Sequence, residues 1–313
     1  MARGMSLAEQ LRGGILGALI GDALGVPYEF HAAQDLPPAD QLELAPPRGF
    51  ARAHPGVPPG TWSDDGAQLL ALLDSLLAHD RLDLDDLGAR LLRWLDAGDY
   101  AVDGRVFDVG NQTRRALQRL ARGTPAAQAG PSDVRDNGNG ALMRVLPLAL
   151  WHTGSDAALV GDARRQGLPT HGHPQSALCC AVYVLWARRT LEGHAQAFEA
   201  AAAAMQALVA DDPAERAELR LVLAPRPVRG SGYVVDTLHA ARWACEAANV
   251  EGVLRRAIAL GDDTDTTACV AGGIAGIRHG EAGIPARWRQ GLRGQAIVDP
   301  LLERLVRHRA PAP

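Results

Sequence analysis

Apolar side chains recur along most of the chain at the spacing of amphipathic helices. Ser6 and Glu9 stand three residues apart, as in a capping box, ahead of apolar residues that share one helical face: Leu7, Leu11, Ile15 and Leu19. Six leucines between residues 69 and 77 mark a second helix. The same pattern predicts helices at residues 84–97, 112–122, 140–151, 174–191, 194–210, 234–249, 251–260 and 266–279.

No run of alternating β-branched residues, the pattern of a half-buried strand, interrupts these helices. The chain has 313 residues, and 47% of them are hydrophobic, which is enough for a sizeable core. The sequence therefore predicts an all-α fold. We expect residues 1–313 to form a single domain.

Three loops punctuate the helical pattern. Residues 31–62 contain seven prolines, and residues 130–140 and 225–233 are rich in glycine, proline and asparagine. A connection as long as the first is unusual in a compact domain and is often a functional lid. Each loop runs directly into a cluster of polar residues, so we expect the three loops to share one rim.

Two acidic clusters each precede a predicted helix. Ser63, Asp64 and Asp65 end the proline-rich loop, and by themselves they are typical helix-capping residues. Residues 261–267 place three carboxylates within four positions, which repel one another unless cations neutralise them. Carboxylate and hydroxyl oxygens without His or Cys suit a hard cation such as Mg²⁺, although a solvated acidic turn has the same composition.

Residues 21–29 add two further carboxylates. Asp22 interrupts an apolar helix face, which costs free energy unless its side chain is paired. Glu29 follows Pro27 just beyond the helix end, and taken alone it is predicted to be a surface glutamate.

Glycine-rich residues 137–140 precede another predicted helix. Backbone N–H groups in such a loop can approach an anion closely, so these residues form a candidate pyrophosphate cradle or a plain turn. His171 and His173 lack neighbouring ligands for zinc, and Tyr233 has the character of either a stacking residue or a core residue.

The net charge of −4 predicts no general affinity for nucleic acid or anionic lipid. The apolar run at residues 13–25 is short, glycine-rich and interrupted by Asp22, so we expect neither a signal peptide nor a membrane span. The four cysteines form no C-x-x-C pair, which favours reduced, buried thiols and a cytoplasmic protein.

Together these clusters resemble the ADP-ribosylglycohydrolase family. The motifs stand in family order from Gly14 to about Gly280: G-D-A-L-G-x-P-x-E, W-S-D-D, G-N-Q-T, N-G-N-G-A-x-M-R, T-H, G-x-G-Y and D-T-D-T. The resemblance implies an orthogonal helical bundle with a dinuclear metal cleft and hydrolysis of the bond between ADP-ribose and an acceptor. The acceptor stays open among arginine, serine, a nucleic-acid base and a small molecule, as does the oligomeric state.

The resemblance also implies the roles of individual residues. Two Mg²⁺ ions, which Mn²⁺ can replace, would be held by Ser63, Asp64, Asp65, Asp263, Asp265 and Thr266. Glu29 would lie beside the metals and the scissile bond, and either Glu29 or Asp64 would act in catalysis. The substrate, and ADP-ribose as product, would contact Asn111, Thr113, Asn139, Gly140, Ala141, His171 and Tyr233.

Three positions depart from the family pattern. Ser63 replaces a common threonine and keeps its hydroxyl, Gly66 replaces another threonine, and Asp262 replaces a glycine and is expected to face solvent. Two other functions stay open: a dimetal hydrolase of a different phosphate-containing substrate, and a non-catalytic ADP-ribose binder.

Overall fold

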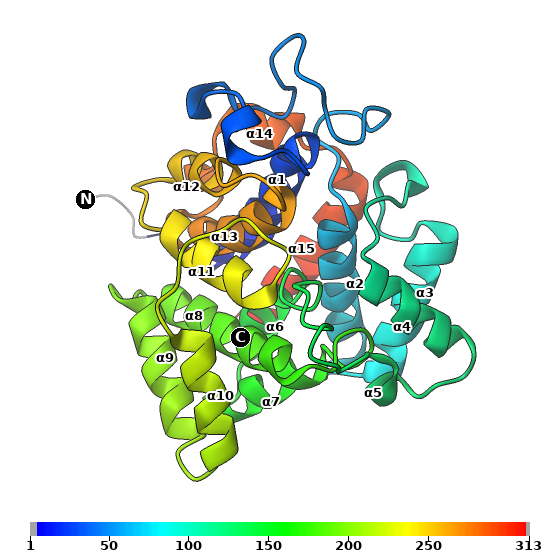
Figure 1. Ribbon diagram of the computed structural model, residues 1–313, viewed down its shortest axis with the longest axis vertical. Helices are drawn as coiled ribbons and strands as arrows, with labels where there is room; N and C mark the ends of the chain where they lie inside the picture. The colour runs from blue at the N-terminus through cyan, green and yellow to red at the C-terminus, as the bar shows by residue number, and fades with distance from the viewer. Residues whose placement is uncertain (1–4, 311–313) are drawn as a thin grey trace.

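Helices make up the regular structure of the protein, and the computed structural model describes residues 5–310 (Figure 1). Within these residues there is no β-strand, so the all-α prediction is confirmed. The α-helices are α1 (Leu7–Gly25), α2 (Asp64–His79), α3 (Leu84–Ala97), α4 (Asn111–Ala121), α5 (Ala126–Ala129), α6 (Leu146–Trp151), α7 (Asp156–Arg165), α8 (Pro174–Leu191), α9 (Ala197–Leu208), α10 (Pro213–Leu223), α11 (Val234–Ala244), α12 (Val250–Ile258), α13 (Thr264–His279), α14 (Ala286–Gly291) and α15 (Gln295–Arg309).

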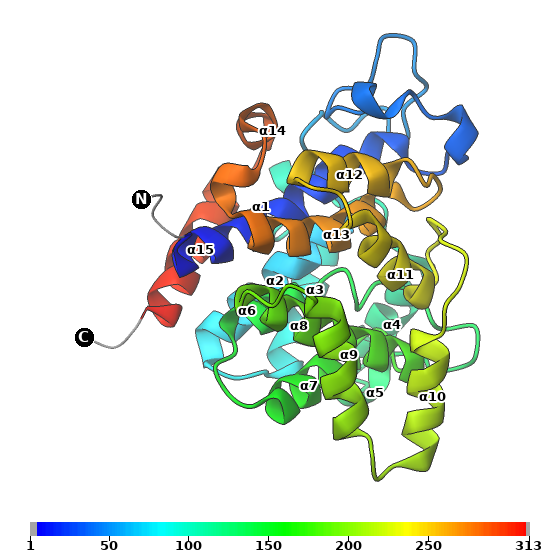
Figure 2. The same ribbon diagram turned by 90° about the vertical axis from the view of Figure 1, so that its left-hand side faces the viewer.

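Helices α1 and α13 lie side by side at the centre of the molecule (Figures 1 and 2). Small residues let their backbones approach closely: a Cβ atom on Gly17 would collide with the carbonyl oxygen of Gly272, and one on Gly21 with that of Ala268. This contact brings the end of α1 directly against the beginning of α13. Residues near 25 and near 265 are therefore neighbours in space.

The remaining helices surround this pair. Helix α2 packs against α3, α6 and α15, while α8 packs against α7, α9, α10 and α11. Helix α12 packs against α13, next to the loop of residues 31–62 that extends at the top of Figure 1. The core is continuous and includes buried aromatic residues from widely separated segments, namely Trp62, Trp94, Tyr183, Trp186 and Trp288.

Several predicted helix boundaries are correct, and others are not. The capping box is confirmed, because Ser6 Oγ accepts a hydrogen bond from the Glu9 N–H at 3.2 Å while Glu9 Oε2 accepts one from the Ser6 N–H at 2.7 Å. The helix predicted at residues 140–151 begins only at Leu146, because residues 140–144 form turns and Pro147 is suited only to a first helical turn. The helix predicted at 234–249 ends at Ala244, and the sequence does not predict α5, α7, α10, α14 or α15.

The loop of residues 31–62 is more ordered than its proline content indicates. Two short 3-10 helices, η2 (Ala33–Asp35) and η3 (Ala39–Gln41), lie within it, and η1 (Val26–Tyr28) precedes it. Its base is anchored, since Leu42 is buried and the Tyr28 hydroxyl donates a 2.8 Å hydrogen bond to the carbonyl oxygen of Glu43. The four cysteines are buried and free, and no helix among residues 5–310 is long and apolar enough to cross a membrane.

Candidate active site

The first turns of α2 and α13 meet at one cavity of about 600 Å³. The hydroxyl of Thr266 lies 3.3 Å from Asp65 Oδ2, and the hydroxyl of Ser63 lies 3.5 Å from the same oxygen. Asp64 and Asp263 also line the cavity, and Asp265 is fully buried beside them. The structure thus brings together the two acidic clusters that the sequence places about 200 residues apart.

Asp22 fixes where α2 begins. Its carboxylate accepts hydrogen bonds from the backbone N–H groups of Ser63 at 2.9 Å and Gly66 at 2.8 Å, which are otherwise unpaired at a helix N-terminus. The pairing that the sequence requires for Asp22 is therefore present. Burial raises the pKa of Asp22 to about 7. At position 66 a Cβ atom would lie 2.7 Å from the Trp62 ring, so this chain has no room for a threonine there.

Glu29 is buried, with 2% of its surface exposed, so its prediction as a surface glutamate is wrong. The cause is a pair of backbone contacts: the Phe30 N–H donates to Asp262 at 2.8 Å, and the Asp262 N–H donates to His31 at 2.8 Å. These bonds fold the chain after η1 back onto the start of α13. One oxygen of Glu29 lies within 4.8 Å of carboxylate oxygens of Asp263 and Asp265, as the family resemblance implies.

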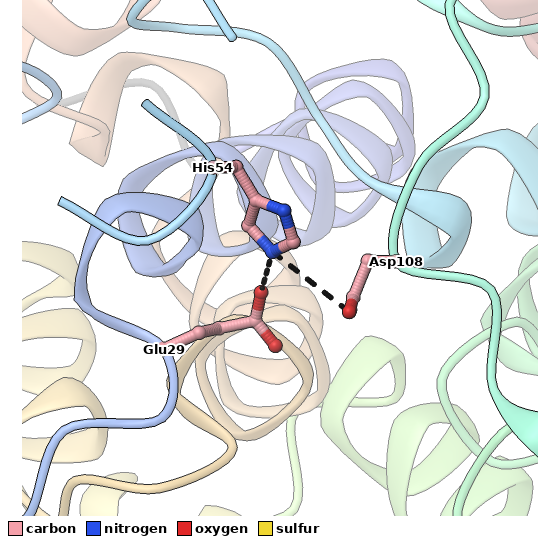
Figure 3. A group of neighbouring side chains, drawn as sticks. All are labelled: Glu29, His54 and Asp108. Carbon is pink, nitrogen blue, oxygen red and sulfur yellow. Dashed lines mark hydrogen bonds and ion pairs between the residues drawn. The ribbon is translucent and has the colours of Figure 1, made fainter. Parts of the chain in front are cut away.

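His54 and Asp108 extend this cluster, and sequence reasoning missed both residues. Figure 3 shows the His54 ring pointing at Glu29, with Nε2 2.7 Å from Glu29 Oε2 and 3.8 Å from Asp108 Oδ1. His54 comes from the proline-rich loop and Asp108 from the segment before α4. A sequence signal existed only for Asp108, which stands three residues before Asn111 in the G-N-Q-T motif.

Burial and mutual repulsion disfavour the ionised form of these carboxylates. Burial raises the pKa of Asp64, Asp65, Asp265 and Glu29 well above the usual range, and neighbouring negative charges raise each of them further. Burial likewise raises the pKa of Asp108 to about 6. Within residues 5–310, Asp65 Oδ1 and Asp265 Oδ2 are buried without a hydrogen-bond partner. Orphaned carboxylate oxygens beside two hydroxyl groups fit a hard divalent cation.

The loop of residues 137–141 is attached directly to this acidic cluster. The side-chain amide of Asn139 donates to Asp263 Oδ2 at 2.8 Å, and its backbone N–H donates to Gly232 at 3.1 Å. Among the described residues, the backbone N–H groups of Gly140 and Ala141 have no hydrogen-bond acceptor. Free N–H groups beside a cavity can bind an anion, as the sequence predicts for this loop.

Some of the remaining candidate residues line the cavity, and others do not. Asn111, Thr113 and His171 line the cavity, and burial together with the nearby Arg144 charge lowers the pKa of His171 well below its usual value. The side chain of Ala141 is buried behind the loop. Tyr233 lies outside the cavity lining, where its hydroxyl donates to Gln175 Oε1 at 2.6 Å.

Residues with a strained backbone and aromatic side chains lie at the mouth of the cavity. Phe30 and His54 have left-handed backbone conformations, with φ of 61° and 49°, which side-chain-bearing residues rarely adopt. Asp108 and Asp262 share this conformation, and Asp262 is exposed as predicted. Phe30 is 70% exposed, and the His54 ring lies 5.8 Å from the Phe30 ring and 5.1 Å from the Phe107 ring.

These features define a class of all-α protein. One cavity contains an acidic cluster whose oxygens suit a cation, next to a loop whose N–H groups suit an anion. Comparison with known proteins identifies the class. The chain belongs to the ADP-ribosylglycohydrolase family, whose model matches residues 3–312.

Its relatives include proteins named as hydrolases. The chain is 30% identical to "ADP-ribosylarginine hydrolase Tri1" of Serratia proteamaculans, over 95% of this chain and 79% of that protein. It is also 30% identical to "ADP-ribosyl-[dinitrogen reductase] glycohydrolase" of Rhodospirillum rubrum, over 99% of this chain and 97% of that protein. A solved structure, "ADP-ribosylglycohydrolase-related protein complex", matches with a TM-score of 0.78 and 33% identity, covering 97% of this chain and 99% of that one. These relationships support hydrolysis of a bond between ADP-ribose and an acceptor.

Proposed function

We propose that this protein is a Mg²⁺-dependent hydrolase that cleaves the bond between ribose C1″ of ADP-ribose and an acceptor, releasing ADP-ribose. One observation carries the proposal: Asp65, which has an orphaned carboxylate oxygen, and Gly140, which has a free N–H group, line the same cavity. The 2.8 Å hydrogen bond from Asn139 to Asp263 ties the two parts together. A ligand in which a pyrophosphate is joined directly to a reacting sugar matches this layout.

The chain's own residues have distinct tasks. Ser63, Asp64, Asp65, Asp263, Asp265 and Thr266 would hold the Mg²⁺ ions, which when bound orient ribose hydroxyls and lower the pKa of a bound water. The N–H groups of Gly140 and Ala141 would hold the pyrophosphate. Bond cleavage develops positive charge at the sugar, and the carboxylates of Glu29 and Asp64 stabilise this charge or take a proton from the attacking water.

We further propose that the acceptor is a guanidinium group. Phe30 lines the cavity and is 70% exposed, so its ring can attract a planar cation through a cation–π contact, and the His54 ring packs against both Phe30 and Phe107. Asp108 and Asp262 add carboxylates beside these rings. The printed names of two relatives, both ADP-ribosylarginine hydrolases, support the same choice.

We expect the protein to act in the cytoplasm and to fold as one cooperative domain. The first expectation rests on its four buried, free thiols. The second rests on α1 and α13, which pack against each other although they come from opposite ends of the chain.

A substrate panel tests the proposed function. Free arginine, a serine peptide and a nucleic-acid base, each ADP-ribosylated, are incubated with the protein in Mg²⁺, in Mn²⁺, in Zn²⁺ and in excess EDTA, and the products are separated by chromatography. We expect free ADP-ribose from the arginine substrate in Mg²⁺ or Mn²⁺ alone. Release of AMP or phosphate would instead indicate another dimetal hydrolase, and tight ADP-ribose binding without turnover would indicate a binding protein.

A further inference from the structure

Arg144 is a fully buried cation to which the mechanism above assigns no task. It ends the N-G-N-G-A-x-M-R motif and stands in the turn between the glycine-rich loop and α6, with 0% of its surface exposed. It forms no ion pair with a carboxylate of the described residues. Instead its guanidinium donates to Gln68, Gln166 and Gly140. Burying an unpaired charge is costly, so a compensating role is expected.

The first contact leads to the acidic cluster. Arg144 Nη1 donates to Gln68 Oε1 at 2.9 Å, and Gln68 Nε2 donates to Asp64 Oδ2 at 3.0 Å. A guanidinium only donates hydrogen bonds, so it fixes the orientation of the Gln68 amide with its oxygen toward Arg144. The NH₂ group is thereby committed to Asp64. Oδ2 of Asp64 therefore accepts a hydrogen bond from Gln68, and Oδ1 does not.

The second contact leads to the glycine-rich loop by the same logic. Arg144 Nε donates to Gln166 Oε1 at 3.0 Å, and Gln166 Nε2 donates to the carbonyl oxygen of Ala141 at 3.1 Å. Arg144 Nη1 also donates to the carbonyl oxygen of Gly140 at 3.3 Å. In a trans peptide the carbonyl and the following N–H point in opposite directions. Holding the Gly140 carbonyl therefore directs the Ala141 N–H away from Arg144.

We propose that Arg144 is a positioning residue for both halves of the site. It acts through Gln68 on the metal-side carboxylate Asp64. It also holds the loop that carries the pyrophosphate-side N–H groups, directly at the Gly140 carbonyl and through Gln166 at the Ala141 carbonyl. This role rests on the proposed function. It predicts two separable effects: Gln68 governs the affinity for Mg²⁺, Gln166 governs the affinity for ADP-ribose, and Arg144 governs both. A purely structural role would lower stability without separating the two affinities.

The test uses Gln68→Met and Gln166→Met, which are similar in size to glutamine and remove the amide. Calorimetry of the full chain measures Mg²⁺ binding without substrate, and then ADP-ribose binding at saturating Mg²⁺. We expect Gln68→Met to weaken Mg²⁺ binding by about 10–100-fold, the usual effect of losing a partner of a metal ligand. It should leave ADP-ribose binding within about threefold. Gln166→Met should weaken ADP-ribose binding by about tenfold, the effect of one hydrogen bond, and leave Mg²⁺ binding unchanged.

Further variants complete the design. Arg144→Met should weaken both affinities, and Arg144→Lys, which retains a donor, should restore part of each. Gln10→Met is the matched control, because the Gln10 side chain donates to the carbonyl oxygen of Leu191 and neither residue lines the cavity, so it should change neither affinity. Should Arg144→Met fail to fold, the two glutamine variants still decide the question.

Two results would overturn the role of Arg144: equal loss of both affinities in each glutamine variant, or a lowered melting temperature with both affinities intact. A parent protein that binds Mg²⁺ and ADP-ribose but releases no ADP-ribose from any substrate would contradict only the proposed hydrolysis. The separate effects of Gln68 and Gln166 would then still support the positioning role.

Discussion

The helix pair α1 and α13 and the loop of residues 31–62 contribute to the same cavity in opposite ways. The helices meet through glycines that allow no added Cβ atom, and they fix Asp22 and Asp265 in fully buried positions. The loop is anchored at its base, but its residue His54, which contacts Glu29, is held in a left-handed conformation and is partly exposed.

This difference assigns distinct tasks to the two regions. Residues that hold a cation must stay within a fraction of an ångström, and close-packed helices provide that rigidity. Residues that select an acceptor vary between relatives most easily on a loop. Glu29 lies at the junction of the two regions, since it follows α1 and contacts His54.

Glu29→Gln probes this junction and should have the largest effect. If Glu29 handles a proton in the transition state, turnover should fall by about 10²–10⁴, while glutamine keeps the size of the side chain. The metal-free variant should melt at or above the parent temperature, because a buried charge among like charges has been removed. Turnover, ADP-ribose affinity and melting temperature would be measured together.

Glu43→Gln is the control for that variant, since Glu43 pairs with Arg255 and Arg287 outside the cavity lining. It should leave turnover unchanged. If Glu29→Gln stays within about threefold of the parent, far below the range for a placed acid or base, Glu29 has no catalytic role.

Gly17→Ala tests the rigid helix pair. The added methyl group would collide with the backbone of α13, so we expect a loss of about 1–3 kcal/mol in the free energy of unfolding. Gly161→Ala in α7 is the matched control, because no atom lies within 4 Å of its added Cβ. This control should gain about 0.5–1 kcal/mol from helix propensity. Equal effects in urea unfolding would show that the close approach of α1 and α13 is unimportant.

Mg²⁺ should change how the stability of the protein depends on pH. The pKa values of Asp22, about 7, and Asp108, about 6, lie above their unfolded values near 4, so between these values the native carboxylates bind more protons than the unfolded ones. Without metal, these two groups should lower the free energy of unfolding by at least about 1 kcal/mol from about pH 5 to about pH 7, whereas histidines with a lowered pKa, such as His171, act in the opposite direction. Mg²⁺ should reduce the carboxylate contribution, because a cation favours the charged carboxylates. Stabilisation by Mg²⁺ should therefore grow from about pH 5 to about pH 7, and stabilisation that is the same at both pH values would contradict this.

Phe30→Ala tests the loop side and should have the smallest effect. Losing an exposed cation–π contact, worth about 0.5–1 kcal/mol, should lower kcat/KM for the arginine substrate about two- to fivefold. ADP-ribose affinity should not change. Leu221→Ala removes another exposed apolar side chain, on α10, and should have no effect on kcat/KM. An equal loss with serine and arginine substrates would argue against a guanidinium acceptor.

The same contrast explains what the sequence could predict. Apolar periodicity is local, so it identified most of the helices, and crowded carboxylates such as Asp263 and Asp265 are visible in the sequence itself. The burial of Glu29 depends on backbone hydrogen bonds that join Phe30 and His31 to Asp262, about 230 residues away, and no local pattern encodes them. His54 carries no signal because its position depends on how a long loop closes. The helix predicted to start at residue 140 failed because the turn-forming loop before Leu146 outweighed helical periodicity.

The most direct test of the central claim, that the carboxylates at the starts of α2 and α13 hold the Mg²⁺ required for cleavage, is a Mg²⁺ titration of ADP-ribose release in the parent and in Asp263→Asn. For the parent we expect no release in excess EDTA, and release that rises with the same midpoint as Mg²⁺-dependent thermal stabilisation. In Asp263→Asn, release and stabilisation should fall together. Full release of ADP-ribose in excess EDTA, or an Asp263→Asn variant with the parent's Mg²⁺ midpoint, would contradict the claim.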